Sequence, residues 1–264
     1  QVLTRAYTLN WEAVAVAVIL MLAVATRFYD LGARVMSHDE ISHVYYSYNY
    51  YRGLGFQHNP LMHGTFQFHV MALNYFLFGA TDATARFPAA LSGVIAVGLV
   101  WVFRRWLGRT GTLVAAALMA FSPYMLYYSR YVRNEAFVVV EGLLMLWAVF
   151  RYFEDRQARW LYLLAASLAL HYTTKETAFI YDAILLLFLG ARFVWDALRA
   201  RWHSPSHRWA FLGGALVAVA GVGLALGTDS LASAETLDVL DDALQLRRSF
   251  PGLSSSAIVR MATL

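Results

Sequence analysis

The clearest candidates for chemistry follow the first apolar segment of the chain, as His38-Asp39-Glu40 with His43 close behind. Adjacent carboxylates on a helical turn project in different directions, so one can face a reacting group while the other caps or pairs locally. A carboxylate that faces a hydroxyl or an amide can act as a general base. The alternative is that Ser37 begins an interfacial helix with acidic residues in its first turn, which is common and does not exclude catalysis.

The same loop is rich in tyrosine and histidine, including Tyr45 to Tyr51, His58 and His63. Tyrosines suit the membrane interface, and they equally suit a stacking surface for a sugar. His38, His58 and His63 are candidate substrate-binding residues. Histidine with carboxylate also suits zinc or manganese, so a divalent metal ion stays open as a cofactor, with His38, Asp39 and His43 as candidate ligands. Their spacing matches no defined metal motif.

A second group, Ser129 to Glu135, lies between two apolar segments and contains Arg130 and Arg133. Guanidinium groups donate paired hydrogen bonds to phosphate oxygens, so phosphate binding is one interpretation. The other interpretation is that both arginines extend their charged ends from the membrane edge into water. Glu135 is a candidate catalytic residue together with Asp39 and Glu40.

The third group is Lys175-Glu176, at the end of another apolar segment. Lys175 is the only lysine in the chain, which otherwise uses arginine as its strong cation. An ammonium at the edge of a membrane is costly and usually functional or paired, so Lys175 and Glu176 are candidate substrate-binding residues. An ion pair of Lys175 with Glu176 or Glu135 is the alternative. Glu141 and Asp182, inside apolar segments, are open to the same two interpretations.

Apolar segments must position these residues, because the chain is 59% hydrophobic and only 14% charged. Runs of about 17 to 22 apolar residues recur, and each is long enough to cross a bilayer as a helix. The sequence therefore predicts an all-α, polytopic transmembrane bundle. The absence of cysteine excludes disulfides and thiolate sites. A lipid bilayer is the expected environment, and no nucleic acid partner is expected.

Seven spans are expected. The segment Gly64 to Phe78 is short and contains Gln67, His69 and Asn74, so it favours an interfacial helix. The first span is interpreted as an uncleaved helix, with a signal peptide as the alternative. The spans run from Trp11 to Tyr29, Arg86 to Trp106, Thr112 to Tyr128, Ala136 to Phe153, Trp160 to Thr174, Thr177 to Trp195 and Trp209 to Gly227.

Charge placement supports this count. Seven spans put basic clusters such as Arg104-Arg105, Arg156 to Arg159 and Arg199 to Arg208 on one side, as the positive-inside rule expects of the cytoplasmic face. An eighth span at Gly64 to Phe78 would invert every later loop. The long loop 30–85 and all three chemical groups then lie on the external face of the cytoplasmic membrane. Residues 1–228 are predicted to form the membrane module and 229–264 a polar tail.

The three groups, in this order, resemble the C-type membrane glycosyltransferases, which include protein O-mannosyltransferases and lipid A aminoarabinose transferases. The resemblance covers about Trp11 to Gly227. Its motifs are the acidic pair after the first helix, Pro60-Leu61, the stretch Leu77-Phe78-Gly79 to Arg86-Phe87-Pro88, the acid after the third helix and the lysine after the fifth. His38-Asp39-Glu40, His58-Asn59-Pro60 and His63-Gly64 are most similar to the branch named for flippase activity in N-glycosylation.

The resemblance implies a polyprenyl-phosphate sugar donor and an acceptor hydroxyl or amide at the external membrane face. It places Asp39 at the family's catalytic acid and Glu135 at the second acidic position, with Arg130, Arg133 and Lys175 near the donor phosphate. Family members usually have more spans and often a soluble C-terminal domain. The chain is therefore interpreted as a fragment or a truncated homologue.

Two alternatives to an enzyme remain at this point. The same external charges could guide a lipid phosphate without bond cleavage, as in a flippase-associated component. The chain could also be a structural membrane subunit, since Gly223 and Gly227 form a small-residue pair that suits packing against a partner membrane protein.

Overall fold

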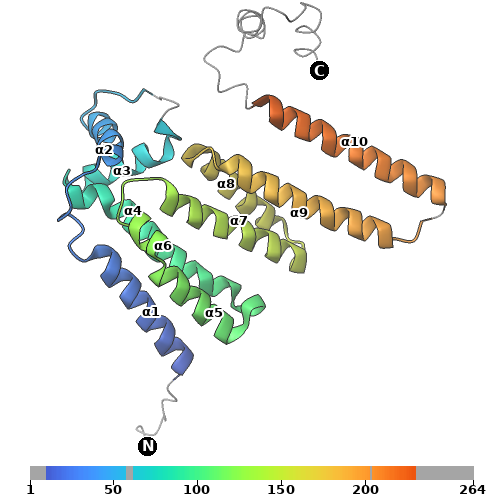
Figure 1. Cartoon of the computed structure of the whole chain (residues 1–264), viewed down its shortest axis with the longest axis horizontal. Coiled ribbons are helices and arrows are strands. Elements are labelled where there is room, and N and C mark those ends of the chain that lie inside the picture. The colour runs from blue at the N-terminus through green and yellow to red at the C-terminus, as the bar shows by residue number, and fades with distance from the viewer. Residues whose placement is uncertain (1–9, 58–61, 203, 230–264) are drawn as a thin grey trace, which may run out of the picture. The chain divides into compact units, whose positions relative to one another are not determined.

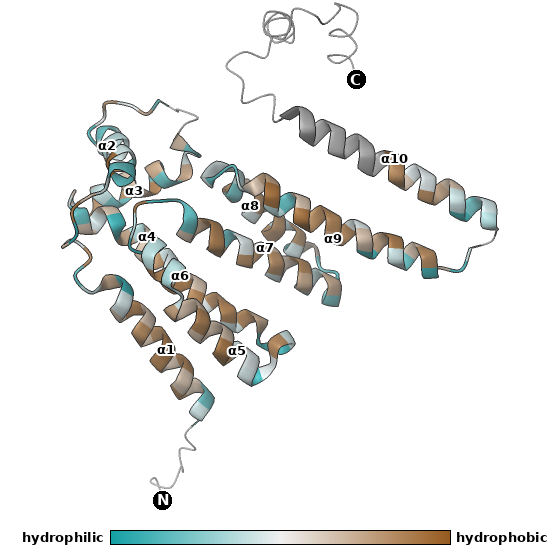
Figure 2. Cartoon of the chain, in the orientation of Figure 1, coloured by the Kyte–Doolittle hydropathy of each residue, from teal (hydrophilic) through white to brown (hydrophobic). Residues whose placement is uncertain are grey.

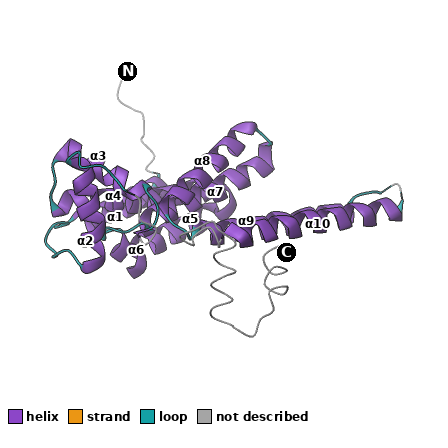
Figure 3. Cartoon of the chain, turned by 90° about the horizontal axis from the view of Figure 1, so that it is seen from above, coloured by secondary structure: helices purple, strands orange, loops and turns teal. Residues whose placement is uncertain are grey.

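The computed structural model describes residues 10–57, 62–202 and 204–229, and the side chains of residues 218–229 are not among those described. Within these ranges all regular elements are helices (Figure 3). The predicted all-α class is therefore confirmed. His58 and most of the tail 229–264 lie outside the described residues.

The chain divides into two compact units, residues 1–183 and 184–264. The predicted division after residue 228 stays a prediction. The second unit contains most of α9 (Ala178–Arg199) and α10 (Pro205–Asp229). The first unit begins α9 and contains the other helices (Figure 1), which are α1 (Trp11–Phe28), α2 (His38–Tyr51), α3 (Phe66–Phe78), α4 (Asp82–Leu99), η2 (Val100–Phe103), α5 (Arg104–Phe121), α6 (Pro123–Tyr128), α7 (Glu135–Asp155) and α8 (Ala158–Thr174).

Helices cover all seven expected spans, with differences in two of them. The second span, Arg86 to Trp106, passes from α4 through the 3-10 helix η2 into α5. The segment Thr112 to Tyr128 is broken between α5 and α6, because Ser122 adopts a non-helical conformation with a ψ of 125° and Pro123 begins a new helix. Proline is favoured at the first position of a helix and disfavoured inside one, which accounts for the break.

Long apolar helices carry the membrane character of the chain. The segments Trp11–Phe28, Asp82–Phe121, Glu135–Asp155 and Ala178–Arg199 are long and apolar enough to cross a bilayer. Figure 2 shows their hydrophobic residues along the helices and hydrophilic residues near the helix ends and in the loops. The count of seven crossings stays a prediction.

Helix α4 is the centre of the first unit, because it packs against α1, α3, α5 and α7, while α8 packs along α7. The helical path breaks at Gly108, whose φ of 69° is left-handed, and α5 packs back against α4. Ala23, Val97 and Ala120 meet in one buried cluster of α1, α4 and α5. Small side chains there allow these helices to approach closely.

The two helices expected in the first loop are present as α2 and α3, which pack against each other. Helix α2 begins after Ser37, as expected, and α3 extends over 13 residues of the predicted interfacial segment. Met71 and Tyr75 of α3 are buried with Ala85 and Val132. This cluster joins α3 to α4 and to the turn before α7, where the candidate site lies.

Candidate active site

Glu40 is fully buried at the start of α2, and its carboxylate is surrounded by hydrogen-bond donors. Arg86 of α4 donates from Nε to Oε1 at 2.8 Å and from Nη2 to Oε2 at 2.9 Å. Arg34 donates to Oε2 at 3.0 Å, and the backbone N–H groups of Ser37 and Val132 donate at 3.1 Å each. These contacts occupy the acceptor positions that a carboxylate has.

The electrostatics of Glu40 follow from these contacts. Burial alone would raise its pKa, but the hydrogen bonds from Arg86, Ser37, Val132 and Arg34 outweigh burial and lower the pKa to about 2. Glu40 is therefore an anion at neutral pH, and it joins α2 to α4 and to the turn before α7.

Asp39 has the opposite environment. Its side chain is 59% exposed, and Arg133 lies beside it, with Nη1 3.3 Å from Asp39 Oδ2. The sequence left open which of the two acids caps the helix and pairs with a cation. In the structure Glu40 does both. Asp39 is accessible to a substrate.

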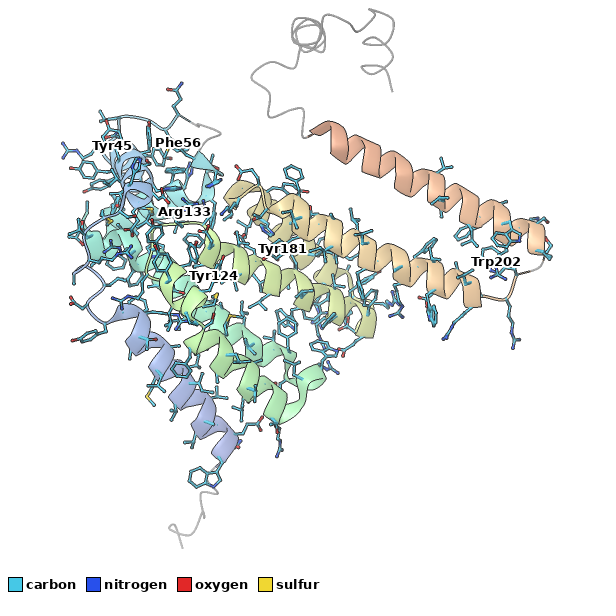
Figure 4. The ribbon with its side chains drawn as sticks, in the orientation of Figure 1. Tyr45, Phe56, Tyr124, Arg133, Tyr181 and Trp202 are labelled. Carbon is cyan, nitrogen blue, oxygen red and sulfur yellow. The ribbon has the colours of Figure 1, made fainter. Side chains whose placement is uncertain are left out.

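A string of alternating charges continues from Asp39 across three segments. Arg133 lies 3.8 Å from Glu135 at the start of α7, and Lys175 Nζ donates to Glu135 Oε1 at 2.6 Å from the end of α8. Figure 4 shows Arg133 at the end of the unit where α2 and α7 begin. Four residues from all three predicted groups thus form one string, which we call the charge string: Asp39, Arg133, Glu135 and Lys175.

Several buried polar atoms along this string have no partner among the described residues. They are Arg133 Nε, Glu135 Oε2 and both polar side-chain atoms of the fully buried Asn134. Buried polar groups are almost always hydrogen-bonded, so such a concentration marks a place where water or a ligand is expected. Asn134 was not singled out by its sequence position.

His63 and Glu176 also meet, with His63 Nδ1 2.7 Å from Glu176 Oε2. The adjacent Gly64 donates its backbone N–H to Thr174 O at 3.2 Å. A Cβ at position 64 would lie 2.1 Å from Thr173 O, so only glycine allows the loop to approach the end of α8 this closely.

The remaining predicted residues are separate from the charge string or differently engaged. Arg130 donates from Nη1 to Thr26 O at 2.8 Å and to Tyr29 O at 2.7 Å, so it caps the end of α1. His38 is exposed in the first turn of α2. His43 is buried, stacks on Phe68 and contacts Asp39 O through Nδ1 at 3.0 Å.

Burial lowers the pKa of His43, so its imidazole is neutral at physiological pH. Across the described residues, no three histidine, aspartate or glutamate side chains are grouped as metal ligands would be. A metal ion held by His38, Asp39 and His43 stays a prediction.

Arg86 and Arg34 hold Glu40 but were not identified as site residues from the sequence. Arg86 lies near the N-terminus of an apolar helix, where the helix dipole disfavours a cation and where the predicted topology has few basic residues. This unfavourable position of a cation could have marked Arg86 as a site residue in the sequence. Arg34 lies in an irregular loop and gave none.

Known proteins resemble this chain in sequence and in fold. The family model for dolichyl-phosphate-mannose-protein mannosyltransferase matches residues 60–224. The structure of the Saccharomyces cerevisiae protein O-mannosyltransferase Pmt1-Pmt2 complex bound to the sugar donor superimposes with a TM-score of 0.55 at 16% identity. No protein of curated function matches the sequence.

The two matches cover different shares of the two chains. The alignment covers 84% of this chain but 33% of the yeast chain, so the chain spans about a third of the length of that relative. At this identity the structural match shows a shared fold. The family match and the apolar helices identify an integral membrane protein. Because the family model covers more than half of the sequence, the chain belongs to the dolichyl-phosphate-mannose-protein mannosyltransferase family.

Proposed function

We propose that the chain carries the catalytic centre of a membrane glycosyltransferase that transfers a hexose from a polyprenyl-phosphate donor to an acceptor hydroxyl or amide at the external membrane face. The observation that carries the proposal is the charge string, in which an exposed carboxylate and two cations lie in sequence at one end of the helices. Family membership supports the same reaction type.

Asp39 is the proposed general base. It accepts the proton of the acceptor while the acceptor oxygen or nitrogen attacks the anomeric carbon of the sugar. The bond between that carbon and the phosphate oxygen breaks, and polyprenyl phosphate leaves with the bonding electrons. Its exposure suits Asp39 to this role, because an acceptor can reach its carboxylate, and Arg133 beside it orients the side chain.

Arg133 and Lys175 are the proposed partners of the departing phosphate. Both now contact carboxylates, and Glu135 lies between them. The oxygens of a donor phosphate can accept charge-assisted hydrogen bonds from these cations in place of the carboxylates. Cations fixed in this position stabilise the negative charge that develops on the phosphate as its bond to the sugar breaks. Glu135 holds the two cations in place, and the unpaired Asn134 side chain supplies further hydrogen bonds.

Glu40 is assigned a positioning role. Its carboxylate accepts donors from α4, from the loop before α2 and from the turn before α7, so it fixes Asp39 relative to Arg133. A buried, fully bonded anion with a pKa of about 2 is a poor proton acceptor at neutral pH.

The test is Asp39→Asn. Turnover, measured as polyprenyl phosphate released from labelled polyprenyl-phosphate mannose in membranes that supply acceptors, should fall by about 10² to 10⁴, the usual loss for a missing acid–base group. Donor binding should survive, because the carboxamide keeps the size of the side chain.

A matched control is Asp82→Asn, which removes another exposed aspartate from the first turn of a helix. Its turnover should equal that of the wild type. Near-normal turnover of Asp39→Asn would overturn the assignment of the base. A wild-type chain that binds the donor and releases no polyprenyl phosphate would favour a non-catalytic, flippase-associated component instead.

A further inference from the structure

A pocket of about 270 Å³ lies next to Lys175, at the C-terminal end of α8. Three segments build it: the loop before α3, the last turn of α8 and the stretch that leads into α9. Close contact between Gly64 and the backbone of Thr173 and Thr174 fixes the first two segments against each other. The lining residues are His63, Gly64, Thr65, Tyr172, Thr173, Glu176 and Phe179.

The chemistry of this lining suits a neutral polyhydroxylated ring. Glu176 and His63 bring a carboxylate and an imidazole together at 2.7 Å, and such groups accept and donate hydrogen bonds to sugar hydroxyls. Tyr172 and Phe179 add aromatic rings 5.1 Å apart, whose apolar faces suit the C–H face of a sugar. The carboxylate of Glu176 would repel a phosphate.

The size of the pocket limits the size of the ligand that it can hold. Ligand pockets generally measure about 300 to 1,000 Å³, so this one is at the small end and suits a single ring. His63 has a left-handed backbone with a φ of 65°, which is uncommon outside glycine and often marks a functional position.

The position of the pocket connects it to the charge string. Lys175 lies between Thr174 and Glu176 in the chain and directs its ammonium to Glu135. Thr173 and Glu176, which flank Lys175 in the chain, line the pocket, so the cation proposed to hold the phosphate is attached to the same turn as the pocket. We propose that this pocket binds the sugar ring of the lipid-phosphate donor, an inference that rests on the proposed function and assigns the donor sugar to His63, Tyr172, Glu176 and Phe179.

The experiment compares two probes, polyprenyl-phosphate mannose and the same polyprenyl phosphate without sugar. Affinities are measured for the purified chain in lipid nanodiscs. Glu176→Gln and Tyr172→Ala should each weaken binding of the mannose lipid by at least about tenfold, the effect expected from a lost hydrogen bond to a charged group or a lost aromatic contact. Binding of the sugar-free lipid should not change. Lys175→Ala should weaken both.

Two controls remove the same kinds of side chain at positions away from the pocket. Asp196→Asn removes a carboxylate that is 60% exposed, close to the 56% of Glu176, but is located on the later part of α9. Tyr162→Ala removes an exposed tyrosine from the beginning of α8. Both should bind both probes as the wild type does. Tyr172→Phe keeps the ring and should retain the mannose preference, which separates stacking from the hydrogen bond of Tyr172 to Asp182.

The outcomes separate this inference from the proposed function. Equal losses on both probes, or no loss on the mannose lipid in either variant, would overturn the sugar pocket even if the wild type turns over. Selective losses in a chain that releases no polyprenyl phosphate would support the pocket and overturn the proposed function. An effect of Glu176→Gln on acceptor KM alone, with donor affinity unchanged, would assign the pocket to the acceptor and overturn the inference.

Discussion

Asp39 and Glu40 are chemically similar neighbours whose environments separate their roles. Asp39 is 59% exposed and has one arginine beside it, whereas Glu40 is completely buried among donors from four residues. A helical turn directs the two side chains to different sides, so one meets solvent and the other meets α4. Both side chains are carboxylates, so residue type alone does not separate them. Exposure makes Asp39 a candidate base, and burial makes Glu40 a structural anion.

The stability of the fold should depend on pH through Glu40. Its pKa is lowered to about 2 from an ordinary value of 4.5, so its contribution is complete above pH 4.5 and is lost as the pH falls towards 2. Removing one partner of a buried ion pair costs about 3 to 5 kcal/mol. Glu40→Gln should therefore unfold at lower temperature than the wild type at neutral pH.

Thermal unfolding of both proteins in detergent across this pH range checks the expectation. The difference between them should shrink as the pH falls from 4.5 towards 2, because the carboxylate of the unfolded wild type takes up a proton in this range and must lose it again to fold. Asp39→Asn is the control and should have little effect on stability. A difference that stays constant down to about pH 2 would contradict the role given to Glu40.

Lys175 should decide donor affinity. Its ammonium contacts Glu135 at 2.6 Å at the end of a predicted membrane span, and the proposed function gives this ammonium a second anionic partner, the donor phosphate. Lys175→Ala should weaken binding of polyprenyl phosphate while the protein stays folded. Arg109→Ala, which removes an exposed cation near Gly108, serves as the control. Unchanged affinity in Lys175→Ala would remove Lys175 from the site.

At the scale of elements, arginine side chains join helix ends. Buried Arg27 of α1 donates to Met119 O and Ala120 O at the end of α5, at 3.2 Å each, and Arg130 donates to the end of α1. The last carbonyls of a helix have no partner within it, and a cation there also complements the helix dipole. These contacts join the end of α1 to the end of α5 and to the turn that contains Arg133 of the charge string.

The loop before α3 is fixed to α8 through Gly64. Gly64→Ala would place a Cβ 2.1 Å from Thr173 O, a backbone atom that cannot move without shifting the end of α8. The substitution should destabilise the protein by about 1 to 3 kcal/mol, the usual cost of overpacking. It should also weaken donor binding, because Lys175 and Glu176 follow directly.

Gly190→Ala provides the matched control, since no atom lies within 4 Å of a Cβ built there and the residue is inside helix α9. Alanine generally stabilises a helix interior relative to glycine. In denaturation experiments Gly64→Ala should therefore lower the free energy of unfolding and Gly190→Ala should raise it. Donor binding should weaken only in Gly64→Ala. A neutral Gly64→Ala would show that the loop can separate from α8 without consequence.

At the scale of the whole molecule, the topology sets the side of the membrane on which the site acts. The chain has no cysteine, so single cysteines report their side directly. Leu54 in the predicted external loop and Arg109 on the predicted cytoplasmic side have exposed side chains, so each suits a labelling experiment. Leu54→Cys should react with an impermeant maleimide on intact cells, and Arg109→Cys should react only after permeabilisation. Reversed labelling would place the site on the cytoplasmic side.

The sequence by itself determined the all-α membrane class, because runs of apolar residues this long can satisfy their backbone in a bilayer only as helices. It also located the helices α2 and α3, and it singled out Asp39, Arg133, Glu135 and Lys175. An ionisable residue beside an apolar segment is costly enough to stand out without any structure.

Tertiary structure decided how these residues divide the work. The sequence could not separate Asp39 from Glu40, because the difference lies in Arg86, which is 46 residues away and meets Glu40 only when α4 packs against the loop before α2. It treated Arg130 and Arg133 as alike, although one caps α1 and the other joins the charge string. Contacts between distant segments depend on packing, which leaves no periodic pattern in the chain, and that is why the pocket beside Lys175 is visible only in the folded molecule.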